Sequence, residues 1–295
     1  LIYTLFFGAN LNEASRWITL PGVNLTFQPS DLAKLGLIMY TARMLSKKQE
    51  RIKDFKSAFV PIILPIVGIC ILIAPADLSS AAVLFFTCLL LMFIGRVSFK
   101  FIMATIGSGI AMLGLVVLIA LNSPDQGRLG TWKVRIESFF DKDAAEPYQV
   151  EQAKIAIAKG KLLGKGPGNS GQRNFLPHPY SDFIFAIIIE EYGLLGASFI
   201  VLLYLLLLYR CIHVVINCPN SFGAILTIGL GLSLVIQAFI NMAVNVNLLP
   251  VTGLTLPLIS MGGTSLWFTS LALGIILSVS RGEEKNVEPA PLGNA

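Results

Sequence analysis

The sequence predicts an all-α polytopic membrane protein with one large extracytoplasmic loop, and three observations support this fold class. Of its 295 residues, 55% are hydrophobic and only 13% are charged, whereas soluble proteins contain roughly 25% charged residues. The apolar runs are continuous rather than alternating, which favours membrane helices over a β-barrel. A single long polar segment, residues 122–181, interrupts these runs. We therefore expect a helical bundle with one segment long enough to hold chemistry.

The first element is the apolar run 1–8, which is too short to cross roughly 30 Å of hydrocarbon. We interpret it as the end of a helix. Residues 9–30 are expected to form a polar turn. Ser30 is expected to cap the next helix, residues 32–45, with Asp31 favourable in its first turn.

Basic residues set the expected topology. The short loop 46–56 is rich in lysine and arginine, and the positive-inside rule assigns such a loop to the cytoplasm. By alternation, residues 122–181 are extracytoplasmic. We interpret residues 1–281 as one membrane domain and residues 282–295 as a disordered cytoplasmic tail. The remaining membrane helices are expected at 58–74, 79–95, 99–121, 183–209, 222–245 and 256–280.

Two patterns superficially resemble ligand sites and are rejected. Residues 160–166 lack the spacing of a phosphate-binding loop and have no Ser or Thr after the lysine. Cys211, His213 and Cys218 fit no zinc spacing, so we expect the four cysteines to be free thiols. We expect no nucleic-acid ligand.

The polar segment still offers groups that could hold a diphosphate. Its glycines expose backbone N–H groups, and its cations could bind phosphate oxygens. The alternative is that these cations face water or anionic lipid headgroups. They are Lys159, Lys161, Lys165 and Arg173.

The acidic candidates follow the polar segment. Asp182 lies where the loop meets a membrane helix, so it is either catalytic or only a favourable acid at a helix start. Glu190 and Glu191 lie two turns deeper, where a charge usually faces a cavity or a cationic partner. Lys34, which either reaches the surface or faces a polar cavity, is one candidate partner. Simple ion pairing is favoured for Glu191.

Other polar residues have structural explanations. Asp77 is a candidate helix cap. A polar stripe near the outer end of the penultimate helix is explained by interhelical hydrogen bonds. It consists of Gln237, Asn241, Asn245 and Asn247.

Short motifs occur in a specific order along nearly the whole chain. They are Ser15-Arg16-Trp17-Ile18, Gln28-Pro29-Ser30-Asp31-Leu32-Ala33-Lys34, Asp77-Leu78, Tyr148-Gln149, Gly164-Lys165-Gly166, Leu176-Pro177, Ser181-Asp182-Phe183-Ile184-Phe185-Ala186, Glu190-Glu191-Tyr192-Gly193, Leu249-Pro250-Val251-Thr252-Gly253 and Leu256-Pro257-Leu258-Ile259-Ser260-Met261-Gly262-Gly263-Thr264-Ser265. In this order and spacing they resemble the SEDS family, the RodA, FtsW and SpoVE membrane proteins of bacterial elongation, division and sporulation.

The resemblance implies a SEDS-type bundle of ten membrane helices with both termini cytoplasmic. About seven helices and part of another are covered here, so the first two and part of the third are expected to precede this sequence. Three departures occur: Asp31 replaces a usual Glu, Met261 replaces a usual Tyr, and Ala76 interrupts a Pro-Asp-Leu-Gly motif. The shorter Asp31 changes the reach of the carboxylate toward Lys34. The segments 15–17 and 174–178 favour the FtsW branch.

The function implied by the resemblance is peptidoglycan glycosyltransferase activity, in which lipid II is polymerised into β-1,4 glycan strands during cell division or elongation. Asp182 matches the essential aspartate of the family and is expected to be the base, with Lys165 or Arg173 stabilising the leaving group. The remaining motif residues are expected to bind substrate (Lys34, Asp31, Gln149 and Ser260) or to support the site (Arg16, Asp77, Glu190 and Glu191).

The resemblance also implies a location, partners and alternatives. The protein is expected in the bacterial inner membrane, with a class B penicillin-binding protein and other divisome or elongasome proteins as partners. A divalent cation, Mg²⁺ or Mn²⁺, could assist the leaving group. The alternative functions are a lipid II flippase and a non-catalytic scaffold for a transpeptidase.

Overall fold

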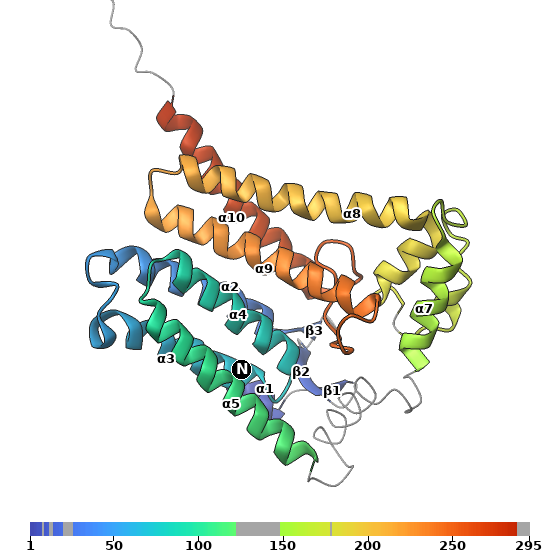
Figure 1. Cartoon of the computed structure of the whole chain (residues 1–295), viewed down its shortest axis with the longest axis horizontal. Helices are drawn as coiled ribbons and strands as arrows, with labels where there is room; N and C mark the ends of the chain where they lie inside the picture. Colours follow the sequence, from blue (N-terminus) through green and yellow to red (C-terminus); the bar gives the residue numbers. More distant parts are fainter. Residues whose placement is uncertain (8, 12–13, 20–25, 122–147, 178, 288–295) are drawn as a thin grey trace, which may run out of the picture. The chain divides into compact units, whose positions relative to one another are not determined.

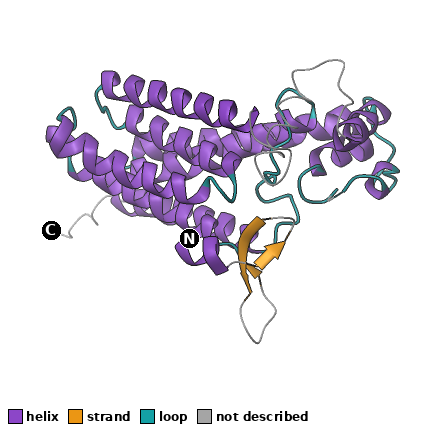
Figure 2. Cartoon of the chain, turned by 90° about the horizontal axis from the view of Figure 1, so that it is seen from below, coloured by secondary structure: helices purple, strands orange, loops and turns teal. Residues whose placement is uncertain are grey.

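The computed structural model is mostly helical, with a small antiparallel sheet near its first residues (Figures 1 and 2). Its residues group into two compact units, each described separately below. Unit 1 comprises Leu1–Phe99, Tyr204–Ile236 and Gly263–Ala295, and unit 2 comprises Lys100–Leu203 and Gln237–Gly262. The structure describes residues 1–7, 9–11, 14–19, 26–121, 148–177 and 179–287.

Four helices of the described ranges are long and apolar enough to cross a membrane. They are Phe55–Ile73, Ile184–Asn217, Ser221–Asn245 and Thr264–Gly282, and Leu78–Ile94 and Phe99–Met112 are shorter apolar helices. These helices confirm the prediction of an all-α polytopic membrane protein. The side of the membrane on which each end lies stays a prediction.

Unit 1 is built around three mutually packed helices: α2 (Pro29–Lys47), α3 (Val60–Ile73) and α4 (Leu78–Ile94). A π-helical turn, η2 (Phe55–Phe59), leads into α3. The short helix α1 (Ile2–Phe7) and the 3-10 turn η1 (Gln49–Arg51) also belong to this unit.

Glycine permits close helix packing in unit 1. At Gly229 of α9 (Ser221–Asn245), an added Cβ would lie 2.8 Å from Leu91 and 2.9 Å from Ile38. The backbone of α9 therefore approaches α4 and α2 more closely than any larger residue would allow. The last helix, α10 (Thr264–Val287), also packs on α2.

The prediction that residues 9–30 form only a polar turn was wrong. Strands β1 (Ala9–Leu11), β2 (Ala14–Thr19) and β3 (Thr26–Phe27) form an antiparallel sheet in the order β1-β2-β3. The β2 segment ends in Trp-Ile-Thr, residue types that favour strands. A short polar region between apolar runs can satisfy its backbone groups as a small sheet as well as in a turn.

The predicted cap at Ser30 was also wrong, although Asp31 does lie in the first turn of α2. The N-cap position is Gln28, because Pro29 occupies the first turn, where its missing N–H costs no hydrogen bond. Ser30 instead accepts a hydrogen bond from the Gln28 side chain at 2.9 Å.

Unit 2 contains a helix that the sequence did not predict, α7 (Tyr148–Gly160), inside the expected loop. One face of α7 carries Ala153 and Ala156, which pack with apolar residues of the loop and of the start of α8. The buried partners are Leu176, Phe183, Ala186 and Ile187. The other elements of unit 2 are most of α5 (Phe99–Leu121), the 3-10 turn η3 (Gln172–Asn174), the first part of α8 (Ile184–Asn217) and the last part of α9, from Gln237. Residues 122–147 of the expected loop lie outside the described residues.

Three predicted helix limits were wrong. Helix α10 ends at Val287 rather than at 280, so residues 282–287, which were predicted to belong to a disordered tail, are helical. The last helix begins at Thr264 rather than at 256, because Pro257 and the positive φ of 68° at Leu258 interrupt the preceding segment. Helix α8 extends to Asn217 rather than 209, so Arg210 lies inside the helix.

Candidate functional site

Asp182 stands at the entrance of α8 and its backbone is held by two buried asparagines of α9. Its carbonyl oxygen accepts hydrogen bonds from Nδ2 of Asn241 at 2.9 Å and from Nδ2 of Asn245 at 3.0 Å. Asn245 Oδ1 in turn accepts at 3.1 Å from the N–H of Ala186 in the first turn of α8, which also donates to the carbonyl of Phe183. This pair of asparagines therefore fixes both the position of Asp182 and the start of the helix.

The segment before α10 also bonds to the backbone that precedes Asp182. Ser260 Oγ donates to the carbonyl of Ser181 at 2.6 Å and accepts from the N–H of Leu256 at 2.7 Å. The N–H of Met261 donates to the carbonyl of Tyr180 at 2.8 Å. Three successive carbonyls, at 180, 181 and 182, are thus each bound by residues from distant parts of the sequence.

The Asp182 side chain is half-buried and carries a free carboxylate edge. Its Oδ1 accepts from Ser181 Oγ at 2.8 Å, and its Oδ2 faces Gly253, where an added Cβ would lie 3.6 Å away. Within the described ranges, no lysine or arginine forms an ion pair with Asp182. An ionised carboxylate held in this way can accept a proton from a substrate hydroxyl.

Helix α8 is interrupted at Gly193, whose φ of 68° and ψ of −169° are not helical. The break frees two carbonyls before it, at Glu190 and Glu191, and two N–H groups after it, at Leu194 and Leu195. The loop after α7 bonds to all four groups. The N–H groups of 165 and 166 donate to the carbonyls of 190 and 191, and the carbonyls of 161 and 162 accept from the N–H groups of 194 and 195.

This arrangement explains why the two glycine-rich motifs occur together. An added Cβ at Gly164 would meet the backbone of Glu191, and one at Gly193 would meet the backbone of Leu162 and Gly164. Both glycines also have positive φ, which other residues adopt at a cost. The loop can lie in the helix break only because these positions lack side chains.

Glu190 is completely buried behind this loop and is fully hydrogen-bonded. Its Oε1 accepts from Lys165 Nζ at 2.6 Å, and its Oε2 accepts from Ser170 Oγ at 2.5 Å and from the N–H of Gln172 at 3.2 Å. Of the two alternatives for Glu190, a cavity or a cationic partner, the structure shows the partner, which is Lys165 rather than Lys34. Among the residues that the structure describes, no ion pair of Glu191 is found, contrary to the favoured prediction, and the pair forms at Glu190.

The other predicted residues of unit 2 differ in their exposure. Arg173 is exposed in η3, and its N–H donates to Ser170 Oγ at 3.2 Å. Gln149 is half-buried in the first turn of α7, and Glu191 is half-buried with its carbonyl bound by the loop. Arg173 is therefore the cation whose guanidinium is presented outward next to the Glu190 cluster.

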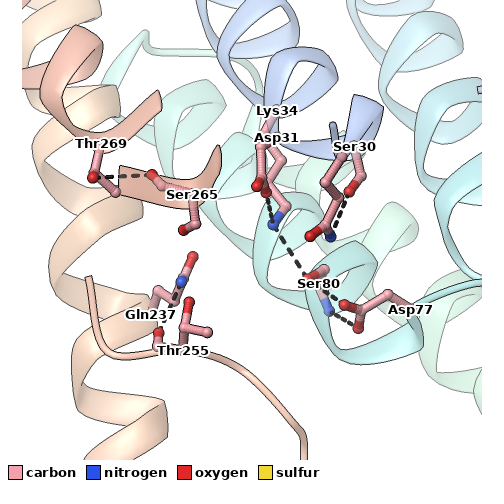
Figure 3. Close-up of polar contacts among 10 residues, drawn as sticks. Ser30, Asp31, Lys34, Asp77, Ser80, Gln237, Thr255, Ser265 and Thr269 are labelled. Atoms are coloured by element: carbon pink, nitrogen blue, oxygen red, sulfur yellow. Dashed lines mark hydrogen bonds and ion pairs between the residues drawn. The ribbon is translucent and has the colours of Figure 1, made fainter. Parts of the chain in front are cut away.

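Unit 1 contains a second polar network, shown in Figure 3. Lys34 Nζ donates to Asp31 Oδ1 at 3.1 Å, one turn earlier in α2, and to Ser80 Oγ at 3.2 Å in α4. Asp77 accepts from the N–H of Ser80 at 3.0 Å and from its Oγ at 2.9 Å. The shorter Asp31 therefore does reach Lys34, and Ser80 links this pair to a second carboxylate.

Asp77 is confirmed as the N-cap of α4, and it is itself buried. Asp31 Oδ2 is buried as well, and no hydrogen-bond partner for it is found among the described residues. Arg16 lies on β2, but its side chain is outside the described residues. The structure thus joins Asp31, Lys34 and Asp77 in one network of unit 1.

The chain matches the model of the FtsW/RodA/SpoVE cell cycle proteins over residues 1–285. It belongs to this family. The match covers both networks described above. Family membership was predicted from the motifs and is confirmed.

Among named relatives, the chain is 36% identical over 285 residues to the probable peptidoglycan glycosyltransferase FtsW of Geobacter sp. (strain M18), covering 95% of this chain and 75% of that protein. It is 34% identical over 277 residues to stage V sporulation protein E of Bacillus subtilis (strain 168), covering 92% of this chain and 72% of that protein. One of these relatives is named as an FtsW protein, and the other is named as a stage V sporulation protein E.

Solved structures of the family share the fold. One chain of a peptidoglycan synthase complex that coordinates polymerization and crosslinking superposes with a TM-score of 0.74 at 26% identity, covering 96% of this chain and 77% of that chain. The crystal structure of the rod shape determining protein RodA of Thermus thermophilus gives a TM-score of 0.65 at 28% identity, covering 96% and 74%.

Two serines of the networks were missed by sequence reasoning. Ser170 and Ser80 each connect an ionised side chain to a second partner, but both lie in segments whose serine content also suits loops and caps. The asparagine stripe was predicted to make interhelical hydrogen bonds. Asn241 and Asn245 do bond outside their own helix, and the partner that they share there is the carbonyl of Asp182.

Proposed function

We propose that this chain is a peptidoglycan glycosyltransferase that polymerises lipid II into β-1,4-linked glycan strands, with Asp182 as its general base. The observation that best supports this role is the support of the Asp182 backbone by Asn241 and Asn245, which leaves the carboxylate edge free. The relatives named glycosyltransferases and the peptidoglycan synthase complex support the same reaction class.

The reaction joins two lipid-linked disaccharides. The acceptor presents the 4-hydroxyl of its GlcNAc, and the donor carries MurNAc joined through an α-linkage at C1 to undecaprenyl diphosphate. As the hydroxyl oxygen attacks C1, its proton passes to the Asp182 carboxylate and the bond to the diphosphate oxygen breaks. Attack from the opposite face inverts C1 and forms the β-1,4 bond. The diphosphate leaves with the bonding electron pair, as an anion.

Ser181 and Ser260 keep the base in place in this scheme. Ser181 Oγ donates to Asp182 Oδ1, which leaves Oδ2 to receive the proton. Ser260 is buried, and both its donor and its acceptor bond to backbone groups, so we assign it to positioning rather than to substrate contact. A base that is fixed before the substrate arrives needs little reorganisation during the reaction.

Arg173 is the better candidate for contact with the departing diphosphate. Lys165 already donates to the buried Glu190 at 2.6 Å, so much of its charge is compensated within the protein. Arg173 is exposed, and a guanidinium can bind two phosphate oxygens at once. Gln149, half-buried in the first turn of α7, is a further polar residue of unit 2 that we assign to substrate contact. Lys34 and Asp31 pair with each other in unit 1, and their expected contact with substrate stays a prediction.

A divalent cation could also assist the diphosphate, but the described residues offer it no cage. No group of three His, Cys, Asp or Glu side chains in the described ranges could hold a metal ion. Mg²⁺ or Mn²⁺ would then be held mainly by the diphosphate oxygens and water, which is a common arrangement for Mg²⁺. The proposed chemistry of this chain's own residues does not depend on it.

The expected setting is the bacterial inner membrane, with Asp182 on the extracytoplasmic side. A class B penicillin-binding protein would crosslink the strands that this chain makes. The fold match to a chain from a complex that coordinates polymerization with crosslinking supports such a partner. Division and elongation remain the two cellular roles for this activity.

The test is polymerisation of labelled lipid II by the purified protein with its cognate transpeptidase, in detergent. Asp182→Asn should lower glycan formation by about 100-fold or more, because loss of a general base typically costs 10²–10⁴-fold. Lipid II binding should be retained. Glu151→Gln, which removes an exposed acid of unit 2, is the matched control and should retain full activity.

Wild-type product from Asp182→Asn at equal folding would remove Asp182 as the base. Absence of product from the wild-type protein in detergent, with lipid II movement in vesicles, would favour the flippase. Normal growth of cells carrying only Asp182→Asn would favour the scaffold.

A further inference from the structure

The loop after α7 and the restart of α8 share an exposed apolar surface. We name it the interfacial patch and define it as Leu162, Leu163, Tyr192, Leu194 and Leu195. The side chains of Leu162 and Leu163 are 58% and 74% exposed, and those of Leu194 and Leu195 are 55% and 56% exposed. Single exposed leucines are common, but four together are not typical of a surface that faces water.

Backbone hydrogen bonds hold the two halves of the patch together. The N–H of Leu194 donates to the carbonyl of Lys161 at 3.0 Å, and the N–H of Leu195 donates to the carbonyl of Leu162 at 3.3 Å. The loop is therefore attached to the first turn of the helix after the break. It must lie at the same depth in the membrane as that turn.

The length of α8 places this turn at the edge of the hydrocarbon. The uncharged stretch from Leu194 to Tyr209, before Arg210, contains about 16 residues, which rise about 24 Å at 1.5 Å per residue. The hydrocarbon core is about 30 Å thick. Even with Arg210 at the opposite boundary, the core extends to the helix break. The interfacial patch then lies at the boundary between acyl chains and headgroups.

The charges beside the patch match the headgroup layer. Lys159 and Lys161 are exposed at the end of α7 and the start of the loop. Lys165 is compensated by Glu190, so Lys159 and Lys161 are the cations free to meet lipid phosphates. The positive φ of 49° at Lys161 turns the chain between α7 and the two leucines. Apolar side chains next to lysines are the usual composition of a segment that lies in a membrane interface.

We propose that residues 159–163 form a membrane-interface anchor. Leu162 and Leu163 enter the acyl-chain boundary of one leaflet, at the end of the membrane where α8 restarts, and Lys159 and Lys161 bind phospholipid phosphates. The anchor would fix the depth of the loop that carries Lys165, the partner of buried Glu190. The contact does not depend on which reaction the protein catalyses.

The test measures the depth of a spin label on the loop in the full-length protein in nanodiscs. The label is attached at Leu163→Cys or, as a second site, Leu162→Cys, in a Cys218→Ser background, because the other three cysteines are buried. Glu151→Cys, an exposed acid of α7, is the control site. Collision rates with oxygen, which concentrates in lipid, and with a water-soluble nickel chelate give the depth.

We expect the ratio of oxygen to nickel collisions at residues 162 and 163 to exceed that at 151 by at least about fivefold. Equal ratios at these sites would overturn the proposal, because the loop would then lie in water. A label shielded from both reagents would overturn it as well, because protein rather than lipid would cover the patch.

A second arm tests the lysines. In nanodiscs containing anionic phosphatidylglycerol, Lys159→Gln combined with Lys161→Gln should reduce the oxygen-to-nickel ratio at residue 163, whereas Lys154→Gln should not. An unchanged ratio in the double variant would overturn the assignment of phosphate binding to Lys159 and Lys161. Neither arm requires catalytic activity, so failure of the proposed function leaves this test intact.

Discussion

Glu190 of α8 and Lys165 of the preceding loop form an ion pair of 2.6 Å in which the carboxylate is fully buried and the ammonium is partly exposed. The same carboxylate also accepts hydrogen bonds from Ser170 and from the backbone of Gln172. One buried charge therefore holds three points of the loop against the break in the helix. We therefore expect the loss of any one of these contacts to lower the free energy of unfolding.

The ion pair can be tested by a double-mutant cycle. Lys165→Met leaves a buried carboxylate without its cation and should destabilise the protein by about 2–3 kcal/mol, less than for a fully buried pair because Lys165 is partly exposed. Glu190→Gln should also destabilise it, because the replacement amide donates where three donors already point. The double variant should lose less than the sum of the two losses. Thermal unfolding in detergent measures the stability of all three variants. If the loss in the double variant equals the sum of the two single losses, Lys165 and Glu190 do not interact.

The helix break predicts a specific glycine effect. Gly193→Ala places a Cβ against Leu162 and Gly164 and forces a non-glycine residue to φ 68°, so it should cost at least about 2 kcal/mol. Gly274→Ala in α10 is the matched control: an added Cβ there meets nothing within 4 Å, and alanine favours a helix. We expect the unfolding temperature to fall for Gly193→Ala but not for Gly274→Ala. Equal unfolding temperatures for both variants would contradict the interruption of α8 at Gly193.

The sequence predicted the membrane helices well because continuous apolar runs leave few alternatives in a bilayer. It failed where backbone groups find partners far along the chain. The break at Gly193 falls inside an apolar run, and it is stable only because residues 161–166 supply the missing hydrogen bonds. Nothing within the run itself indicates such a partner. The late start of α10 is partly of the same kind: Pro257 and the positive φ of Leu258 interrupt the helix, and Ser260 of the non-helical segment bonds to the distant carbonyl of Ser181.

The candidate site shows a similar division. The motifs indicated Asp182, Lys165 and Glu190 as candidate site residues. Their spacing alone did not predict the ion pair between Lys165 and Glu190. Lys34 was a reasonable partner for Glu190 from charge alone. In the structure, Lys34 is already bonded to Asp31 and Ser80 within unit 1. An acidic residue three or four positions from a lysine in a helix indicates an ion pair, and Asp31 and Lys34 have the i, i+3 spacing.

The asparagines of α9 should affect catalysis through Asp182. Asn241→Ala and Asn245→Ala each remove a hydrogen bond to the Asp182 carbonyl, which should lower kcat for lipid II polymerisation by about tenfold with little change in KM. Each should also cost about 1–2 kcal/mol of stability, because buried groups lose their partners. Gln237→Ala is the control: it removes a bond of the same helix to the carbonyl of Thr255. If Gln237→Ala lowers kcat to a similar extent, the effect of the asparagines comes from the general stability of α9 and not from their bonds to Asp182.

The last prediction concerns the cap of α4. Asp77 accepts from the N–H and the hydroxyl of Ser80, and that hydroxyl also accepts from Lys34. Asp77→Ala removes the cap and should cost about 1–2 kcal/mol. Asp77→Asn retains one oxygen that can accept from the N–H of Ser80 and cap the helix, so any loss in this variant reports the charge together with the second oxygen, which accepts from the Ser80 hydroxyl. Thermal unfolding of the two variants therefore separates these contributions. If Asp77→Asn is as stable as wild type while Asp77→Ala is not, Asp77 stabilises unit 1 as a cap; if both are equally destabilised, the carboxylate, with its charge and its second acceptor for the Ser80 hydroxyl, is the essential feature.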